Sequence, residues 1–194
     1  DKPYLLFIGD VADNLAGKTA HGIVDWRPEW CVGQMRLSGC KADCGVPDLS
    51  INEAVSKGAR TMIVGVANAG GTLPDHWISC ILQALEAGLN VATGLHKRLN
   101  SIPEIAEAAS RMGRKLHDVR FADINFSTGK GLKRAGLRLL TVGTDCSVGK
   151  KYTALAIDRE MNKRRMKRDF RATGQTGVLI SGRGVRSEEH TSEL

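Results

Sequence analysis

The chain contains the turn Gly143-Thr144-Asp145-Cys146-Ser147-Val148-Gly149-Lys150. The apolar residues 137–142 lead directly into it and predict a buried strand, and a helical spacing of apolar residues follows it at Ala154, Leu155, Ile157 and Met161. A strand, a glycine-containing turn, a lysine and a helix in this order are typical of a phosphate-binding loop. Successive backbone N–H groups, the helix N-terminus and the lysine ammonium all attract phosphate there. We therefore predict that residues 143–150, with the neighbouring Lys151, bind the phosphates of a cofactor.

The turn departs from the usual GxxxxGK[ST] pattern in two places. Thr144 occupies the position of the first glycine, because one more residue than usual separates Gly143 from Gly149. Lys151 stands where a serine or threonine would hold magnesium, although Thr153 follows two residues later. The second departure puts ordinary Mg-ATP coordination in doubt. The phosphate could belong to ATP, to coenzyme A or to a substrate.

A second cluster of glycines follows at Asp169-Phe170-Arg171-Ala172-Thr173-Gly174-Gln175-Thr176-Gly177 and at Gly182-Arg183-Gly184. Such a run is costly to order unless the backbone approaches a ligand closely. We interpret it as a second wall of the site, in which Arg171 or Arg183 binds an anion and Thr173 or Gln175 orients a substrate. The alternative is a solvent-exposed loop between strands.

The first part of the chain alternates short apolar runs with helical patterns, which indicates a parallel sheet. We predict strands at 4–8, 61–66, 90–94 and 116–121, helices at 50–57, 74–87 and 102–112, and an irregular region up to residue 47. Ser50 and Glu53 form a capping-box pattern before the first of these helices. The loop 67–71 follows a strand at the edge where open α/β sheets bind ligands, although no GxGxxG follows the first strand.

These patterns predict an α/β protein with two domains. A Rossmann-like domain covers residues 1–125, a linker covers 126–136, and the N-terminal part of a P-loop NTPase-like domain covers 137–185. Residues 186–194 match the conceptual translation of a common sequencing adapter. We therefore expect the natural protein to continue beyond Val185, and we assign no function to this tail.

Composition limits the class of protein. The 194 residues are 42% hydrophobic and 25% charged, which is typical of a soluble globular protein. No apolar run is long enough to span a bilayer, and the chain is expected in the cytoplasm. Five cysteines without framework spacing indicate reduced thiols, and the pair Cys40 and Cys44 lacks a second pair of zinc ligands, so we predict no metal site.

The net charge of +7 is weak evidence about binding partners. We interpret the basic clusters as a solvated helix face and a linker, and secondarily as an attraction for phosphorylated or carboxylate ligands. No nucleic-acid motif accompanies them, so neither nucleic acid nor membrane is expected as a partner. A small-molecule substrate is expected, and a homo-oligomer is possible.

The turn 143–150, the following Tyr152-Thr153-Ala154-Leu155 and the segment 170–177 together resemble the DgcN family. This resemblance implies a Rossmann-like domain, a P-loop domain and a longer full-length protein, without which this chain alone is expected to be inactive. It also implies an N-acetyltransferase that moves acetyl from acetyl-CoA to an acidic amino acid such as D-glutamate. Lys150 and the backbone of 144–149 would then hold the phosphates of coenzyme A.

Two other functions stay open. The Gly-Thr-Asp spelling before Val-Gly-Lys is similar to the loop of dethiobiotin synthetase, which would imply an ATP- and Mg²⁺-dependent ligase or kinase. A nucleotide-binding module without turnover is the non-enzymatic alternative. No catalytic base is assigned, because His21, His76, His96 and His117 are each interpreted as loop or surface histidines. Cys146 could carry an acyl group, but a packing role is the preferred interpretation.

Overall fold

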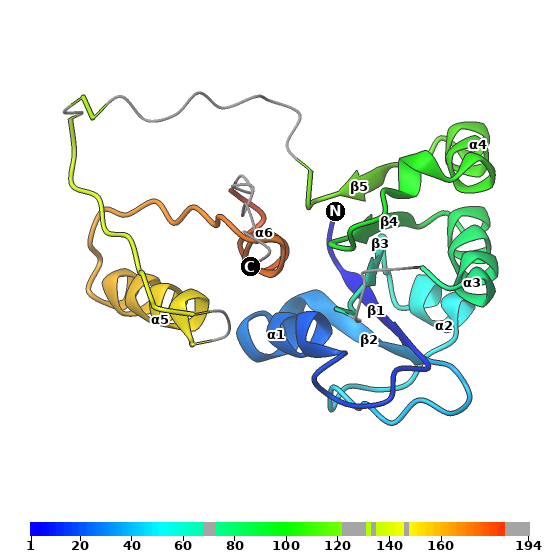
Figure 1. Cartoon of the computed structure of the whole chain (residues 1–194). Coiled ribbons are helices and arrows are strands. Elements are labelled where there is room, and N and C mark those ends of the chain that lie inside the picture. The colour runs from blue at the N-terminus through cyan, green and yellow to red at the C-terminus, as the bar shows by residue number, and fades with distance from the viewer. Residues whose placement is uncertain (68–72, 122–130, 133–134, 146–147, 185–194) are drawn as a thin grey trace. The chain divides into compact units, whose positions relative to one another are not determined.

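The computed structural model describes residues 1–67, 73–121, 131–132, 135–145 and 148–184. The chain forms two compact units, Asp1–Phe121 and Ala122–Leu194. Each unit is described by itself, and Figure 1 shows the elements of both.

Unit 1 is built on a parallel sheet of five strands in the order β2-β1-β3-β4-β5. Their bounds are β1 (Tyr4–Gly9), β2 (Cys31–Arg36), β3 (Thr61–Val64), β4 (Asn90–Thr93) and β5 (Leu116–Asp118). β3 and β4 are buried throughout, as expected for parallel strands covered on both faces. The chain passes from β1 outward to β2 and then back across to β3. The strand order therefore reverses between β1 and β3, and this place is the topological switch point of the sheet.

Helices cover both faces of this sheet. They are α1 (Lys18–Trp26), α2 (Ile51–Ser56), α3 (Asp75–Glu86) and α4 (Pro103–Met112), with short 3₁₀ turns η1 (Pro28–Trp30) and η3 (Leu99–Ser101). α1 lies on one face, and α2, α3 and α4 lie on the other (Figure 1). Because each connection joins parallel strands, the N-terminus of every crossover helix lies near the carboxyl edge of the sheet. This edge is where the loops 10–17, 37–50 and 94–98 gather.

The predicted strands and helices from residue 50 to residue 118 are confirmed to within a few residues. The capping box is also present: the Ser50 hydroxyl accepts a hydrogen bond from Glu53 N–H at 3.3 Å, and the Glu53 carboxylate accepts one from Ser50 N–H at 2.8 Å. Gly58 ends this helix region with a φ of 86°, which a residue with a Cβ rarely adopts.

The prediction of an irregular region before residue 47 is wrong, because this region contains α1, η1 and β2. The hydrophobic pattern does not indicate β2, because β2 is an edge strand that contains glycine and glutamine. Gln34 is nevertheless only 1% exposed. Its amide donates to Asp43 at 2.8 Å and accepts from Cys44 N–H at 2.8 Å. A buried polar residue satisfied by the following loop is invisible to a hydrophobic pattern.

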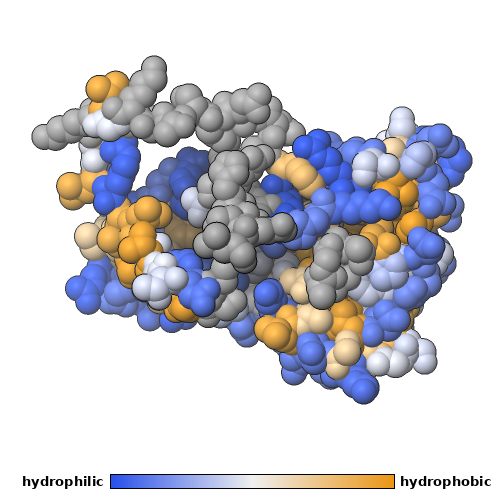
Figure 2. Space-filling model, viewed as in Figure 1, coloured by the Kyte–Doolittle hydropathy of each residue, from blue (hydrophilic) through white to orange (hydrophobic). Residues whose placement is uncertain are grey.

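Unit 2 contains α5 (Lys150–Lys163), α6 (Gln175–Ser181) and an isolated bridge between Ala172 and Gly184. The predicted strand at 137–142 is wrong in the described structure, since these residues form no ladder. Leu139 is 73% exposed and Val142 is 79% exposed. Apolar residues also reach the surface on the face drawn in Figure 2. A strand needs neighbours that pair with its N–H and C=O groups, and the described part of unit 2 supplies none.

Candidate functional site

The predicted phosphate-binding turn stands at the start of α5. Gly149 adopts the left-handed conformation with a φ of 94° and precedes the first helical residue, Lys150. The first helical bond runs from Thr153 N–H to Gly149 O at 2.9 Å. The backbone N–H groups of residues 150–152 therefore lie in the first turn of the helix, before its first hydrogen bond and at its positive end. Such amides can bind an anion.

Residues 143 and 145 of the turn lie against the side chain of Lys150. Its Nζ donates a hydrogen bond to the carbonyl oxygen of Asp145. A Cβ added at Gly143 would lie 3.2 Å from Cγ of Lys150 and 2.7 Å from Cγ2 of Val148. Position 143 therefore accepts only glycine without a rearrangement of the turn. Cys146 and Ser147, which complete the predicted turn, lie outside the described residues.

Lys151 places a second ammonium group beside this turn. Its Nζ lies 4.5 Å from the centre of the Tyr152 ring. The hydroxyl of Thr141 donates to the carbonyl of Lys150 at 3.0 Å and ties the preceding segment to the helix start. The position that normally supplies a magnesium-binding hydroxyl thus supplies a cation, which suits the direct binding of an anion.

Two arginines predicted to bind a substrate converge on one carboxylate. Arg171 donates to Oδ2 of Asp169 through Nε at 2.9 Å, and its Nη2 lies 2.8 Å from the same oxygen. Arg183 places Nη1 3.6 Å from Oδ1 of the same residue. The structure therefore brings Arg171 and Arg183 together. It shows their guanidinium groups facing a carboxylate, the group that arginine binds with the best geometric match.

The other two predicted substrate residues have different surroundings. Thr173 is exposed, and Gln175 is the first residue of α6. The alternative interpretation, a solvent-exposed loop between strands, does not hold through residue 177, because α6 begins at Gln175. Three apolar residues of this helix, Val178, Leu179 and Ile180, occur in a row, and Leu179 and Ile180 are buried. Burial of this helix face overrides the low helix propensity of glycine.

The two predicted walls of the site lie next to each other. A Cβ at Gly177 in α6 would lie 2.9 Å from Cβ of Ala172 and 4.0 Å from Cγ of Lys151. Gly177 of α6 therefore lies beside Ala172 and beside the side chain of Lys151 at the start of α5. The start of α5 and the segment next to the arginine pair therefore belong to the same part of unit 2.

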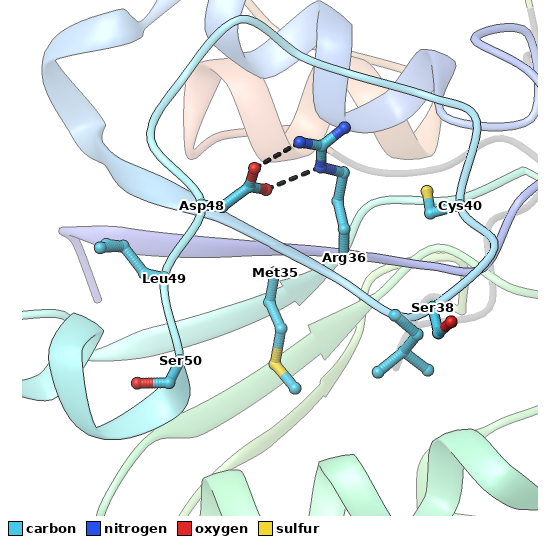
Figure 3. A pocket seen from close by; sticks show the side chains of 8 residues that line it. Met35, Arg36, Ser38, Cys40, Asp48, Leu49 and Ser50 are labelled. Carbon is cyan, nitrogen blue, oxygen red and sulfur yellow. Dashed lines mark hydrogen bonds and ion pairs between the residues drawn. The ribbon is translucent and has the colours of Figure 1, made fainter.

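Several features of unit 1 were missed by sequence reasoning. A cavity of about 600 Å³ opens at the carboxyl end of β2 (Figure 3). Its lining residues are Met35, Arg36, Leu37, Ser38, Cys40, Asp48, Leu49 and Ser50. Arg36 is paired with Asp48 through both carboxylate oxygens, with Nε 2.7 Å from Oδ1. The hydrogen bond from Arg36 holds the pKa of Asp48 below its usual range.

The switch point of unit 1 also carries a polar cluster. Asp10 directly follows β1 and lies 3.0 Å from Nε2 of His76 at the start of α3. The indole N–H of Trp77 donates to the same carboxylate at 2.7 Å. Of the loop predicted at 67–71, only Ala67 lies within the described residues. No local sequence pattern predicts this contact, because the two residues are 66 positions apart in the chain.

Burial shifts the pKa values of one histidine and two cysteines in unit 1. His117 is not a loop or surface histidine as predicted, because it lies in β5 with its Nε2 buried and unpartnered among the described residues. Burial lowers the pKa of His117. Burial likewise raises the pKa of Cys31 and of Cys44 to about 12, so neither thiol is a ready nucleophile. Within the described part of the chain, no three metal-binding side chains are clustered.

None of the described helices has the length and apolar content that crossing a membrane requires. The fold and the site together define a two-domain α/β protein, in which a Rossmann-like sheet precedes a P-loop-like turn at the start of a helix. Residues 35–122 match the Rossmann-like domain of unknown function DUF1611_N, and residues 125–191 match the P-loop domain DUF1611_C. The chain belongs to this DUF1611 family.

Individual relatives agree with this assignment. A D-glutamate N-acetyltransferase of Tritonibacter scottomollicae is 52% identical over 95% of the chain, and one of a Pseudoalteromonas species is 48% identical over 94%. A crystal structure of a DUF1611 family protein from Anabaena variabilis is 28% identical, with a TM-score of 0.76 over 95% of the chain. The chain spans 56%, 55% and 56% of these three proteins, respectively.

Proposed function

We propose that this chain forms part of an N-acetyltransferase that moves the acetyl group of acetyl-CoA to the amine of an acidic amino acid such as D-glutamate. The observation that carries the proposal is the pairing, within unit 2, of an anion-binding helix start with two arginines on one carboxylate. The names of the two relatives at 52% and 48% identity support the same reaction.

The helix start supplies the cofactor half of the proposal. Coenzyme A carries phosphates at its nucleotide end, and the backbone amides in the first turn of α5 with the ammonium of Lys150 suit these groups. Lys150 would exchange its bond to the Asp145 carbonyl for a phosphate oxygen. Lys151 adds a second cation at the same place.

The arginine pair supplies the substrate half. Asp169 occupies Arg171 and Arg183 with a carboxylate of the chain itself. A substrate carboxylate presents the same two oxygens, so it can replace Asp169 against the guanidinium groups. An acidic amino acid brings two such carboxylates, which favours it over a neutral one. Free thiols at Cys31, Cys40, Cys44 and Cys80 agree with action in the reducing cytoplasm.

The test is release of free thiol when the full-length protein that contains this chain meets acetyl-CoA and a panel of D- and L-amino acids. D-glutamate should give the fastest release. Lys150→Ala should raise the KM for acetyl-CoA by about 10- to 100-fold, since a charged hydrogen bond contributes about 1.5–3 kcal/mol. Lys163→Ala, at the other end of the same helix, is the matched control and should leave the KM unchanged. The absence of thiol release with every amino acid would exclude the proposed reaction.

A second candidate is an ATP-dependent ligase or kinase, favoured by the Gly143-Thr144-Asp145 start of the turn. It predicts the release of ADP from ATP and Mg²⁺ with a carboxylate or amine substrate. Lys151 weakens this candidate, because an ammonium group cannot coordinate magnesium. ADP formation without thiol release would decide in its favour.

A further inference from the structure

The chain reverses direction at the end of α5. Arg165 follows the helix with a left-handed φ of 54°. Its N–H donates to the carbonyl of Asn162 at 2.9 Å, and the N–H of Met166 donates to the carbonyl of Met161 at 3.0 Å. These two bonds form the Schellman motif, which ends a helix with a residue in the left-handed conformation. The chain then runs back along α5 towards the start of this helix (Figure 1).

One end of this returning segment is held by an ion pair with α5. Nε of Arg168 lies 3.1 Å from Oδ1 of Asp158, which belongs to the second half of the helix. The side chain of Asp158 is 16% exposed and that of Arg168 is 29% exposed. A second ion pair of α5, between Glu160 and Arg164, has exposed fractions of 52% and 70%. Because solvent screens a partly buried pair less, Asp158 and Arg168 form the stronger electrostatic link.

The opposite end of the returning segment lies near the start of α5. Gly177 of α6 lies beside both Ala172 and the side chain of Lys151, the second residue of α5. Lys151 and Asp158 are about 10 Å apart along the helix axis. The returning segment spans about 13 Å from Arg168 to Ala172 when it is extended. The two lengths agree, so the segment runs alongside α5 towards the anion-binding start of this helix.

The backbone holds the two arginines of the candidate site side by side. The N–H of Ala172 donates to the carbonyl of Arg183 at 3.3 Å, within the isolated bridge between Ala172 and Gly184. The two backbones are so close that a Cβ at Gly184 would clash with the carbonyl oxygen of Ala172. Arg171 directly precedes this bridge, and both guanidinium groups reach Asp169. The position of the returning segment therefore decides where the arginine pair lies relative to α5.

We propose that Asp158 is a positioning residue of the substrate site. Through Arg168 it holds the arginine pair, Arg171 and Arg183, at a fixed distance from the start of α5. This inference rests on the proposed function, because that function assigns the substrate carboxylate to the pair and the cofactor phosphates to the helix start. Two bound reactants combine fast only in the correct relative geometry, so the ion pair acts on the reaction although Asp158 contacts neither reactant.

Binding of D-glutamate tests the inference without requiring turnover. The measurement is calorimetric titration of the full-length protein that contains this chain. Asp158→Asn should raise the Kd by about 10-fold, which corresponds to about 1.4 kcal/mol and is typical of coupling within one charged network. Glu160→Gln is the matched control, because it removes a carboxylate of the same helix that pairs with Arg164 instead, and its Kd should be unchanged. An unchanged Kd in folded Asp158→Asn would overturn the inference.

An exchange of the two charges covers the case in which Asp158→Asn does not fold. Ellipticity at 222 nm reports the folding of each variant. The double variant that combines Asp158→Arg with Arg168→Asp restores the ion pair in the reverse direction. It should recover the ellipticity and most of the affinity for D-glutamate. A double variant that does not recover the affinity would overturn the inference.

Kinetics separate this inference from the proposed function. Asp158→Asn should raise the KM for D-glutamate and leave the KM for acetyl-CoA unchanged, because the start of α5 stays intact. A role in stability alone would lower the folded fraction, and hence the apparent kcat, without changing either KM. Thiol release with an unchanged KM for D-glutamate would reject the positioning role while the acetyl transfer stands. Weaker binding of D-glutamate by Asp158→Asn, without thiol release from any protein, would reject the acetyl transfer while the positioning role stands.

Discussion

Asp48 shows how a single ion pair links stability to pH in this protein. Arg36 contacts both oxygens of its carboxylate, and this contact lowers the pKa of Asp48 in the folded state. Because the folded pKa lies below the unfolded one, the pair stabilises the fold above the ordinary Asp pKa of about 3.9. This stabilisation is lost as the pH falls through the lower, folded pKa.

Asp48→Asn should therefore reduce the urea midpoint at pH 7. The difference from the unmodified protein should shrink as the pH falls below about 4. Urea titrations followed by ellipticity at several pH values measure it. Glu107→Gln is the control, since Glu107 is exposed on α4 and no ion pair is recorded for it in the described structure. A difference that stayed constant with pH would show that the pair does not act through the charge of Asp48.

The residues of the candidate site were predictable to different degrees. The turn 143–150 is contiguous, so glycine, lysine and their spacing signal it directly. The sequence indicated Arg171 and Arg183 as candidate anion-binding residues, but it did not indicate Asp169 as their common partner. The contact of Asp10 with His76 joins two crossover units of the sheet. Only the fold can create it, because neither residue has a distinctive local pattern.

α2 owes its start to the side chains of Ser50, which also lines the cavity, and Glu53. Ser50 and Glu53 satisfy each other's backbone N–H groups, which the helix itself leaves without partners. Ser50→Ala removes one of these acceptors and should lower the free energy of unfolding by about 1 kcal/mol. Urea unfolding followed by tryptophan fluorescence measures the loss.

A position in the same helix provides the comparison. The hydroxyl of Ser56 donates to the carbonyl of Asn52 at 2.9 Å, which is a bond inside the helix rather than at its start. Ser56→Ala should stay within about 0.5 kcal/mol of the unmodified protein, since alanine is the better helix former. Equal losses from both substitutions would mean that the capping box contributes nothing specific.

The elements that sequence reasoning found and missed differ in their surroundings. β1, β3 and β4 are central strands, so nearly all of their residues are buried and each contains consecutive apolar residues that the pattern detects. β2 lies at the edge and buries Gln34 through the loop that follows it, a contact that no local pattern records. For the segment 137–142 the error is the reverse: the sequence predicts a strand that the structure lacks. Its apolar run satisfies the pattern of a central strand, but a strand also requires partners.

The two units differ in how much apolar surface they bury. The central strands and the inner faces of α1, α3 and α4 give unit 1 a continuous core. In the described part of unit 2, the buried apolar side chains are Leu155, Ala172, Leu179 and Ile180. Hydrophobic burial is the main favourable term in folding, at about 25 cal/mol per Å² of apolar surface. Unit 2 should therefore be the less stable of the two.

This difference predicts two separate unfolding transitions. All three tryptophans, Trp26, Trp30 and Trp77, belong to unit 1, so tryptophan emission reports this unit alone, whereas ellipticity at 222 nm also reports α5 and α6. In urea, ellipticity should begin to fall at a lower concentration than the one that changes the emission. A chain that ends at Phe121 is the control: its two signals should coincide, and its emission midpoint should equal that of the longer chain. Coincident curves in the longer chain would contradict the prediction that unit 2 unfolds before unit 1.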